Sequence, residues 1–296
     1  TSIGDSVTNM YMTFYDCPSL KYAPYLGNSV TNMQRAFYGC TNLSSLTIGT
    51  GLSSIGSNAF DDCSNLKSIN LPNSITFINS FAFAHCTNLS SVVIPDSISI
   101  INCFTFFGCS NLEEVVIPNN VKHIFLYAFA SCTSLNTFSI PQSVEHIESY
   151  AFHNTAFFNN KDNWTDNVLY KDGCLLSADT LLSGEYSIPK TTRLIVANAF
   201  ENCKKLTAIT IPDSITTIEG CTFDNCSNLT TVVIGSNVAD IKEYAFENCT
   251  NLTTIICLAK EPPTLITYPK DKYSKIIAPL LRDTFSENIT ATLLVP

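Results

Sequence analysis

One phrase recurs along the chain with a fixed step of 23 residues. "AFDDCSNLKSINLP" (59–72) is followed by "AFAHCTNLSSVVIP" (82–95), and "AFENCKKLTAITIP" (199–212) repeats it much later. A constant period of this length is typical of a solenoid, in which each repeat forms one turn and packs only against its neighbours. The cysteines that hold the register are Cys17, Cys40, Cys63, Cys86, Cys109, Cys132, Cys203, Cys226 and Cys249.

Apolar residues occupy fixed positions within each repeat. When the Cys is counted as position 1, position 4 is Leu, position 7 is apolar and position 9 is mostly Ile or Leu, as in Leu89, Val92 and Ile94. The alternation at positions 7 and 9 predicts a short strand with one apolar face, and a Pro that often follows at position 10 ends it. The apolar residues at positions 13, 16, 20 and 21 are assigned to a tighter return path without strands. Because one turn cannot offset its own loss of conformational entropy, the turns are expected to stack.

Departures from the repeat divide the chain into segments of one expected domain, 1–296. Thr155 stands where a Cys is due, and two apolar runs around Asp172-Gly173 predict a hairpin. The expected segments are variant amino-terminal turns (1–39), regular turns (40–154), an irregular insertion with a hairpin (155–179), regular turns (180–256) and a carboxyl-terminal cap (257–296).

Composition narrows the classes of function. The net charge is −9, and only 14% of residues are charged, so nucleic acid and anionic membranes are not expected as partners. No apolar run approaches the ~20 residues of a membrane span, so direct membrane insertion is not expected either. Motifs such as G-x-S-x-G, H-E-x-x-H or a phosphate-binding glycine loop are missing from the sequence. We therefore predict no enzymatic activity, no cofactor and no metal site.

With the L-x-x-L-x-I pattern established, the chain resembles a leucine-rich repeat protein. Its unit, "AFxxCxNLxxIxIPxxVxxI", closely resembles the BspA-like (Treponema pallidum-type) class, and the "NVLYKDGCLLSAD" interruption (167–179) resembles a feature of that family. The resemblance implies an α/β-type solenoid with little regular helix, right-handed, with short parallel strands on its concave face. It also implies a secreted bacterial protein at the cell surface, linked to adhesion, whose signal or anchor is presumed to have been trimmed.

Positions 6 and 8 of each strand should point away from the core, onto the concave face. The side chains there are small, nearly uncharged and rich in hydroxyl groups, which suits either a plain solvated sheet or a broad protein-binding surface. The candidate residues are Ser45, Thr47, Ser68, Asn70, Ser91, Val93, Glu114, Val116, Thr137, Ser139, Thr210, Thr231, Val233 and Thr254.

Aromatic residues recur at position 19, just before the Ala-Phe pair of positions 20 and 21. They are expected to form a ridge along one edge, either as partly buried packing or as a contact strip for a sugar or a protein. We refer to the predicted residues as the aromatic ridge: Phe81, Phe104, Tyr127, Tyr150 and Tyr244.

Three further repeated residue types have structural and functional interpretations. The cysteines are interpreted as a row of buried thiols in preference to a disulfide ladder or a metal row, because equivalent side chains should point into the core. Asn at position 3, as in Asn42 and Asn88, is interpreted as an amide ladder that serves the loop backbone, with glycosylation as the alternative. His123 and His146 share position 15 in consecutive turns and are expected to be stacked neighbours.

Three functions follow from these patterns. The leading hypothesis is a non-enzymatic surface protein that binds a macromolecule, with a host or neighbouring-cell protein as the expected partner. The second is a structural spacer within a larger surface protein. The third is a carbohydrate-binding module, with a glycan on the aromatic ridge.

Overall fold

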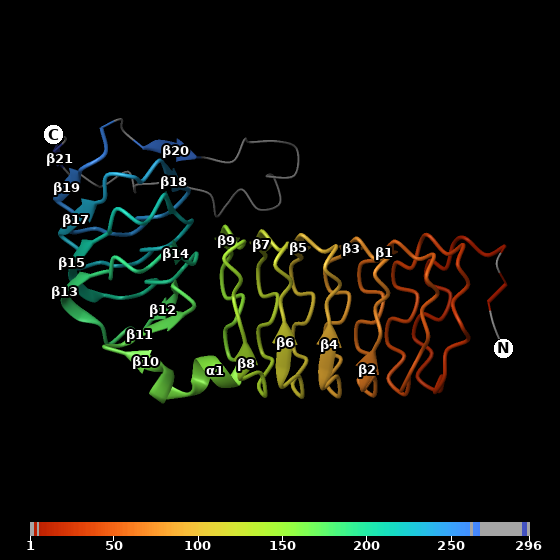
Figure 1. Ribbon diagram of the computed structural model, residues 1–296. Coiled ribbons are helices and arrows are strands. Elements are labelled where there is room, and N and C mark those ends of the chain that lie inside the picture. Colours follow the sequence, from red (N-terminus) through yellow and green to blue (C-terminus); the bar gives the residue numbers. More distant parts are fainter. Residues whose placement is uncertain (1–2, 5, 261–262, 267–291, 295–296) are drawn as a thin grey trace. The chain divides into compact units, whose positions relative to one another are not determined.

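The computed structural model describes residues 3–4, 6–260, 263–266 and 292–294. It divides into two compact units, Thr1–Lys161 and Asp162–Pro296, which we call unit 1 and unit 2 (Figure 1). Each is built of short, mostly parallel strands with almost no helix. The β-solenoid predicted from the period is therefore confirmed.

The principal sheet of unit 1 is parallel and contains one short strand from each of four successive turns (Figure 1). Equivalent residues of successive repeats pair directly, so that Ser68 lies opposite Ser91 and Ser91 lies opposite Glu114. Each residue therefore pairs with the residue one repeat further along the chain, so the repeat period sets the register of the sheet. The strands are β2 (Ser68–Ile69), β4 (Ser91–Val93), β6 (Glu114–Val116) and β8 (Thr137–Phe138).

The return path of each turn also carries strand, which corrects the expectation that it would have none. Positions 15 and 16 pair in parallel from turn to turn, as His123 does with His146. Two-residue strands leave no alternation to detect in a sequence, although the apolar position 16 was correctly placed in the core. These strands are β1 (Ser54–Ile55), β3 (Phe77–Ile78), β5 (Ile100–Ile101), β7 (His123–Ile124) and β9 (His146–Ile147).

The insertion begins with a short helix and continues as an antiparallel meander. Thr155 caps α1 (Ala156–Asn159): its hydroxyl accepts a hydrogen bond from the Phe158 N–H at 3.1 Å. Asp172 and Gly173 both have positive φ and join two antiparallel strands, so the predicted hairpin is confirmed. A second tight turn at Asp166-Asn167 was not predicted. The elements are η1 (Lys161–Asn163), β10 (Trp164–Thr165), β11 (Val168–Lys171) and β12 (Cys174–Ala178).

Unit 2 then resumes the solenoid. Tyr186 lies opposite Ile209 in a parallel ladder, so residues 180–202 form a turn in register despite lacking the Cys. The long sheet contains β13 (Ser183–Ser187), β15 (Lys205–Thr210), β17 (Thr231–Ile234), β19 (Thr254–Cys257) and β21 (Thr292–Leu294). The return path contains β14 (Leu194–Ile195), which pairs with β12, and β16 (Thr217–Ile218), β18 (Asp240–Lys242) and β20 (Thr264–Ile266), which pair together.

The predicted cap, 257–296, is described only in part. Its final strand is present, because β21 extends the long sheet by pairing in parallel with β19. Residues 261–262, 267–291 and 295–296 lie outside the described residues.

A column of phenylalanine rings forms the centre of the core. Phe37, Phe60, Phe83, Phe106 and Phe129 are fully buried. Neighbouring rings stack with centroids 5.3 to 5.5 Å apart and nearly parallel planes. A second column, Phe200, Phe223 and Phe246, repeats this arrangement in unit 2. Each ring covers its neighbour, so no turn has a closed core of its own.

Two positions in each turn adopt left-handed backbone conformation. Position 19 has positive φ at Asn58 and Tyr127, among others, and position 23 has it at Asp62 and His85. Asn and Asp tolerate this region, whereas bulky side chains rarely adopt it. The aromatic residues at position 19 therefore adopt a backbone conformation that their own side chains disfavour.

Candidate functional site

The outer face of the β2–β4–β6–β8 sheet is the surface predicted to be concave, and we call it the sheet face. Every predicted residue of the sheet face in unit 1 is exposed. Val93 and Val116 lie directly opposite each other in β4 and β6, with exposed fractions of 71% and 60%. Glu114 is the one charged side chain of this predicted set. The exposed residues are Ser45, Thr47, Ser68, Asn70, Ser91, Val93, Glu114, Val116, Thr137 and Ser139.

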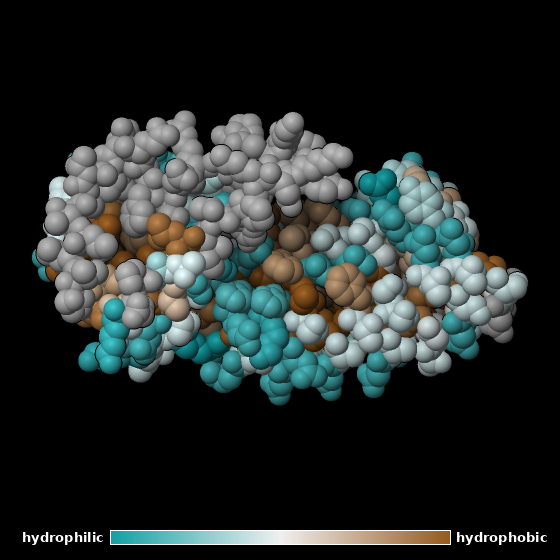
Figure 2. Space-filling model, turned by 90° about the horizontal axis from the view of Figure 1, so that it is seen from above, coloured by the Kyte–Doolittle hydropathy of each residue, from teal (hydrophilic) through white to brown (hydrophobic). Residues whose placement is uncertain are grey.

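The equivalent row in unit 2 is less open. Thr210 is exposed, whereas Thr231, Val233 and Thr254 are half-buried. In unit 1 the surface seen from above is mostly hydrophilic or of intermediate hydropathy, and hydrophobic side chains show only in patches (Figure 2).

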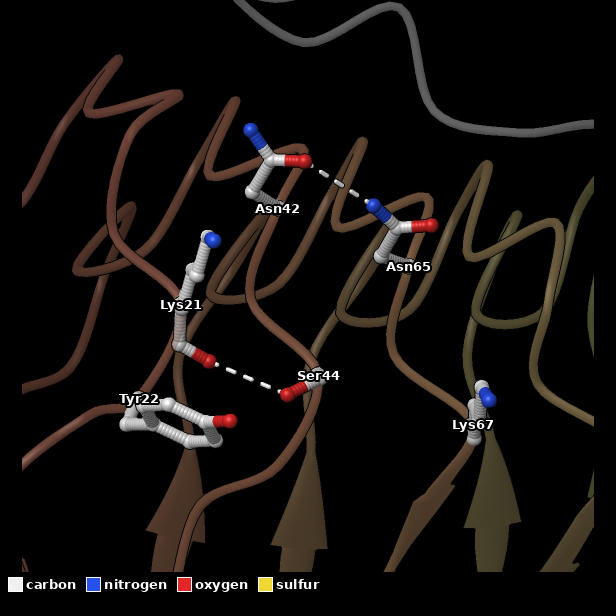
Figure 3. Close-up of a pocket in the computed structure, with 6 residues that line it drawn as sticks. All are labelled: Lys21, Tyr22, Asn42, Ser44, Asn65 and Lys67. Carbon is white, nitrogen blue, oxygen red and sulfur yellow. Dashed lines mark hydrogen bonds between the residues drawn. The ribbon is translucent and has the colours of Figure 1, made fainter.

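A shallow cavity of about 210 Å³ lies where the chain enters the strands of the sheet face. Lys21 and Lys67 stand at equivalent positions two turns apart, with Ser44 between them, and Tyr22 lies beside them with 72% of its side chain exposed (Figure 3). The Ser44 hydroxyl donates to the Lys21 carbonyl oxygen at 3.1 Å. Sequence reasoning missed this cluster, although Lys at position 5 in alternate turns was a detectable signal.

The position-3 asparagines form the predicted ladder, but in a different way from that expected. Asn65 donates its amide N–H to the side-chain oxygen of Asn42 at 3.0 Å (Figure 3). Asn88 donates in the same way to Asn65 at 3.1 Å. Asn111 continues the chain at 3.2 Å. The amides therefore bond chiefly to one another instead of to the loop backbone. Asn42, at the start of the ladder, donates to a backbone oxygen, that of Pro18.

The aromatic ridge exists in unit 1 as a continuous stack. Ring centroids are 4.5 Å apart for Phe81 and Phe104, 5.0 Å for Phe104 and Tyr127, and 5.1 Å for Tyr127 and Tyr150. All four side chains are half-buried. Because the rings stack face to face, the ridge presents mainly ring edges to solvent.

Tyr244 does not belong to this ridge, which corrects the sequence prediction. Its side chain is only 6% exposed. The preceding residues at position 19 in unit 2 are Asn198 and Cys221, so Tyr244 has no aromatic equivalent to stack on in those turns. Repeat position alone was insufficient to predict exposure.

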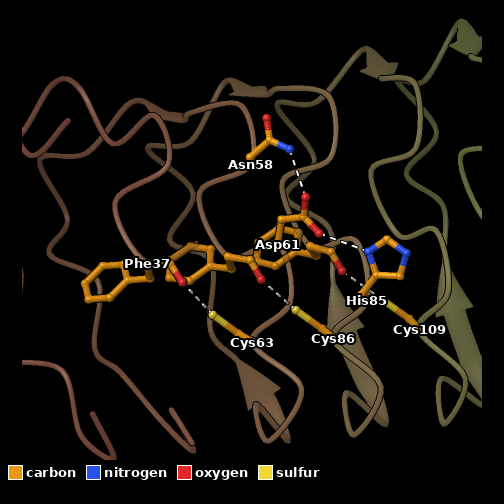
Figure 4. A network of polar contacts seen from close by, with 9 residues as sticks. Phe37, Asn58, Asp61, Cys63, His85, Cys86 and Cys109 are labelled. Carbon is orange, nitrogen blue, oxygen red and sulfur yellow. Dashed lines mark hydrogen bonds and ion pairs between the residues drawn. The ribbon is translucent and has the colours of Figure 1, made fainter. Parts of the chain in front are cut away.

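The repeated cysteines are free thiols, and all of them except the half-buried Cys17 are buried. In most turns the S–H group donates to the carbonyl oxygen of the Phe one turn earlier, as Cys63 does to Phe37 at 3.1 Å (Figure 4). The thiols of Cys17 and Cys203 donate instead to the carbonyl oxygens of Tyr15 and Asp179. Burial raises the pKa of the Cys132 thiol to about 12 and that of the Cys86 thiol well above its ordinary value. The predicted row of buried thiols is confirmed, and its members are neutral, unreactive groups at neutral pH.

A buried carboxylate lies beside this row. Asp61 is buried, and both of its carboxylate oxygens have polar partners. Asn58 Nδ2 donates to one oxygen at 2.9 Å, and His85 Nδ1 lies 3.0 Å from the other (Figure 4). Its charge is the main cause of a raised pKa at Tyr38. The contact between Asp61 and His85 joins neighbouring turns, so the network serves packing between repeats.

The histidine pair has the expected geometry. The rings of His123 and His146 stack with centroids 5.2 Å apart and planes 4° from parallel. Lys122 Nζ forms an ion pair with Glu145 Oε1 at 2.6 Å, and this contact lowers the pKa of Glu145. Within the described residues, no group of three or more His, Cys, Asp or Glu side chains is placed to hold a metal ion. In the same residues, no helix has the length and apolar character needed to cross a membrane.

The chain is similar to several proteins of solved structure. Among solved structures, a leucine rich cell surface protein from Faecalibacterium prausnitzii is 26% identical with a TM-score of 0.48, covering 86% of this chain and 79% of its own. A leucine-rich repeat protein from Bacteroides ovatus is 22% identical with a TM-score of 0.46, covering 98% and 88%. The Treponema pallidum leucine rich repeat protein is 24% identical with a TM-score of 0.45, covering 70% and 75%.

A comparison with curated proteins finds no match. The family comparison is decisive, because six copies of the BspA type leucine rich repeat region match residues 32–159 and 180–272, most of the chain. The family predicted from the repeated phrase is therefore confirmed. The chain belongs to the BspA type leucine-rich repeat family.

Proposed function

We propose that this chain is a non-enzymatic protein of the bacterial cell surface that binds another protein through the sheet face. The family supports a protein-interaction role in general. The expected partner is a protein of a host matrix or of a neighbouring cell.

The exposed valine pair is the observation that carries this proposal. Val93 and Val116 lie side by side on strands whose other outward residues are Ser91 and Glu114. Two large apolar side chains held in water by a rigid sheet gain free energy when a partner covers them. A surface without opposing charges suits a partner that contributes apolar and hydroxyl-bearing side chains, since steering by charge is weak there.

The sheet face is tested by removing its apolar atoms while keeping its shape. The double variant Val93→Thr, Val116→Thr retains β-branched side chains that favour strands. Phe77→Thr is the matched control, because it removes an exposed apolar side chain from the return path. Binding of the full chain is measured on a panel of immobilised extracellular-matrix proteins.

At least one matrix protein should bind, and the double variant should weaken that binding at least tenfold while Phe77→Thr leaves it unchanged. Equal binding by the double variant would refute the sheet face as the contact surface. Binding to none of the panel would contradict the proposal and favour the structural spacer.

The aromatic ridge is a weaker candidate for a glycan. Sugars pack against open aromatic faces, but the faces of Phe104 and Tyr127 are occupied by neighbouring rings. If a glycan bound the wild type, and Tyr127→Ala and Tyr150→Ala abolished that binding, the result would support the carbohydrate-binding hypothesis.

A further inference from the structure

The insertion that interrupts the repeat forms one wall of a second cavity, within unit 2. The cavity encloses about 480 Å³, a volume typical of small-molecule sites. One side comes from the meander β10–β12 and the other from the turn that follows it. The lining residues are Thr165, Asp166, Tyr170, Gly173, Tyr186, Pro189, Thr191 and Thr192.

A tyrosine pair at this cavity departs from the repeat. Tyr186 stands at position 7, where the regular turns have an apolar residue such as Ile69 or Val92. Its hydroxyl lies 3.0 Å from the hydroxyl of Tyr170, which comes from β11. Packing against the core requires no polar atom at this position. The Tyr at this position therefore adds a hydroxyl group that the packing of the repeat does not require.

The polar groups of the cavity are only partly satisfied. Two phenols sharing one hydrogen bond retain one further donor and several lone pairs. Thr192 is 1% exposed, and its hydroxyl has no hydrogen bond of good geometry among the described residues. A weaker polar contact with Tyr170 offsets part of the rise in the pKa of that phenol. A buried hydroxyl without a partner is costly, so a ligand that supplies one is favoured.

The charge of the lining restricts the ligand. Asp166 is the one carboxylate among the lining residues, which include no Lys, Arg or His. An anion would meet a carboxylate without a compensating cation. A cation accepts no hydrogen bond, so it would leave the hydroxyl donors unmatched. A neutral molecule with many hydroxyl groups matches donors, acceptors and the carboxylate together, since its hydroxyls both donate and accept.

Both phenols carry their proton at neutral pH, and burial strengthens this. Burial is the main cause of a raised pKa at Tyr170 and at Tyr186, and the hydrogen bond to Tyr186 raises the pKa of Tyr170 further. Aromatic rings at the cavity also offer an apolar surface to the C–H groups of a sugar ring.

We propose that this cavity binds a neutral saccharide, with Asp166, Tyr186 and Thr192 as its hydrogen-bonding residues. All the lining residues belong to unit 2, so this proposal can be tested independently of the proposal that the sheet face binds a protein. The probes are the methyl glycosides of glucose, galactose, mannose and N-acetylglucosamine, added to the full chain. Binding is detected by saturation-transfer NMR and quantified by calorimetry.

Three variants remove single polar groups at nearly constant volume: Asp166→Asn, Tyr186→Phe and Thr192→Val. Asp166→Asn is the variant least able to disturb folding, because Asp166 is exposed and Asn also tolerates its positive φ. Thr210→Val is the matched control, since it removes an exposed hydroxyl outside the cavity. Thermal unfolding of each variant shows whether the fold is retained.

At least one glycoside should bind saturably, and each folded cavity variant should weaken binding about tenfold while Thr210→Val has no effect. The proposal is overturned if none of the four glycosides binds, or if Asp166→Asn binds as tightly as the wild type. Preferential binding of tetramethylammonium, used as a cationic probe, would assign the cavity to a cation and would equally overturn the proposal.

Discussion

The thiol of Cys86 donates a hydrogen bond to the carbonyl oxygen of Phe60, in the neighbouring turn, over 3.1 Å (Figure 4). The same oxygen accepts the backbone N–H of Cys63 at 3.0 Å. A buried carbonyl oxygen thus has both of its lone pairs used, one within its own turn and one between turns. This arrangement explains why the repeat keeps Cys: the side chain is small, apolar in bulk and still able to donate.

Replacing Cys86 by Ala should destabilise the protein by about 1–3 kcal/mol, because it removes the donor to a buried carbonyl and leaves a small void. The free energy of unfolding in urea measures this cost. Cys103→Ala removes the same atoms from a half-buried side chain outside the row, and it should cost less than about 1 kcal/mol. Equal costs would show that the hydrogen bond between turns contributes nothing.

Stability should fall steeply with pH above about 9. Burial raises the pKa of Cys132 to about 12 in the folded state, whereas an unfolded thiol titrates near pH 8.5. Below the unfolded value both states hold the proton, so these thiols cause no pH dependence. Above it only the folded state keeps the proton, and each such thiol removes about 1.4 kcal/mol of stability per pH unit.

The measurement for this effect is the urea midpoint between pH 7 and pH 10. Cys132→Ala should flatten the alkaline slope by the contribution of one thiol. A midpoint that stays constant up to pH 10 would contradict the burial of the thiol row.

The phenylalanine column should be the most sensitive part of the core. Phe129→Ala should cost roughly 3–5 kcal/mol, because its ring is fully buried between Phe106 and Phe152 and a cavity would remain. Ser91→Ala, on the sheet face, should cost almost nothing. Chemical denaturation of both variants tests the assignment of inner and outer positions, and comparable losses would contradict it.

The left-handed backbone at position 19 predicts a difference between Gly and Ala. Asn58→Gly and Asn58→Ala both remove the side chain that bonds to Asp61. Only Ala places a Cβ atom on a residue with φ of 54°, so it should be less stable than Gly by about 1 kcal/mol. The comparison uses thermal or urea unfolding. An Ala variant as stable as the Gly variant would show that the turn relaxes without cost.

Much of the fold was predictable because the repeat imposes the same environment on every turn. Leu89, Val92 and Ile94 are buried as their spacing predicted, and so are their counterparts in most turns. The repeat period does not predict a feature that depends on which side chains lie next to one another. Tyr244 and Tyr150 share a repeat position, yet one is buried and the other belongs to a stack.

Sites that combine separate segments were beyond sequence reasoning. The cavity in unit 2 requires the hairpin to lie against the next turn, which brings Tyr170 to Tyr186. The two-residue strands at positions 15 and 16 were missed because so short a segment shows no alternation. The sheet face was predicted residue by residue, since outward positions follow directly from the register, but its binding role remains a proposal.

The central claim is that each turn seals the core of its neighbour, and native-state thiol labelling tests it most directly. The full chain is treated with iodoacetamide at neutral pH with and without urea, and each Cys is followed by mass spectrometry. Cys63, Cys86, Cys109 and Cys132 should stay unlabelled until the protein unfolds, whereas the half-buried Cys17 should react in the folded state. Labelling of Cys86 or Cys109 in native buffer as fast as in urea would contradict the stacked solenoid.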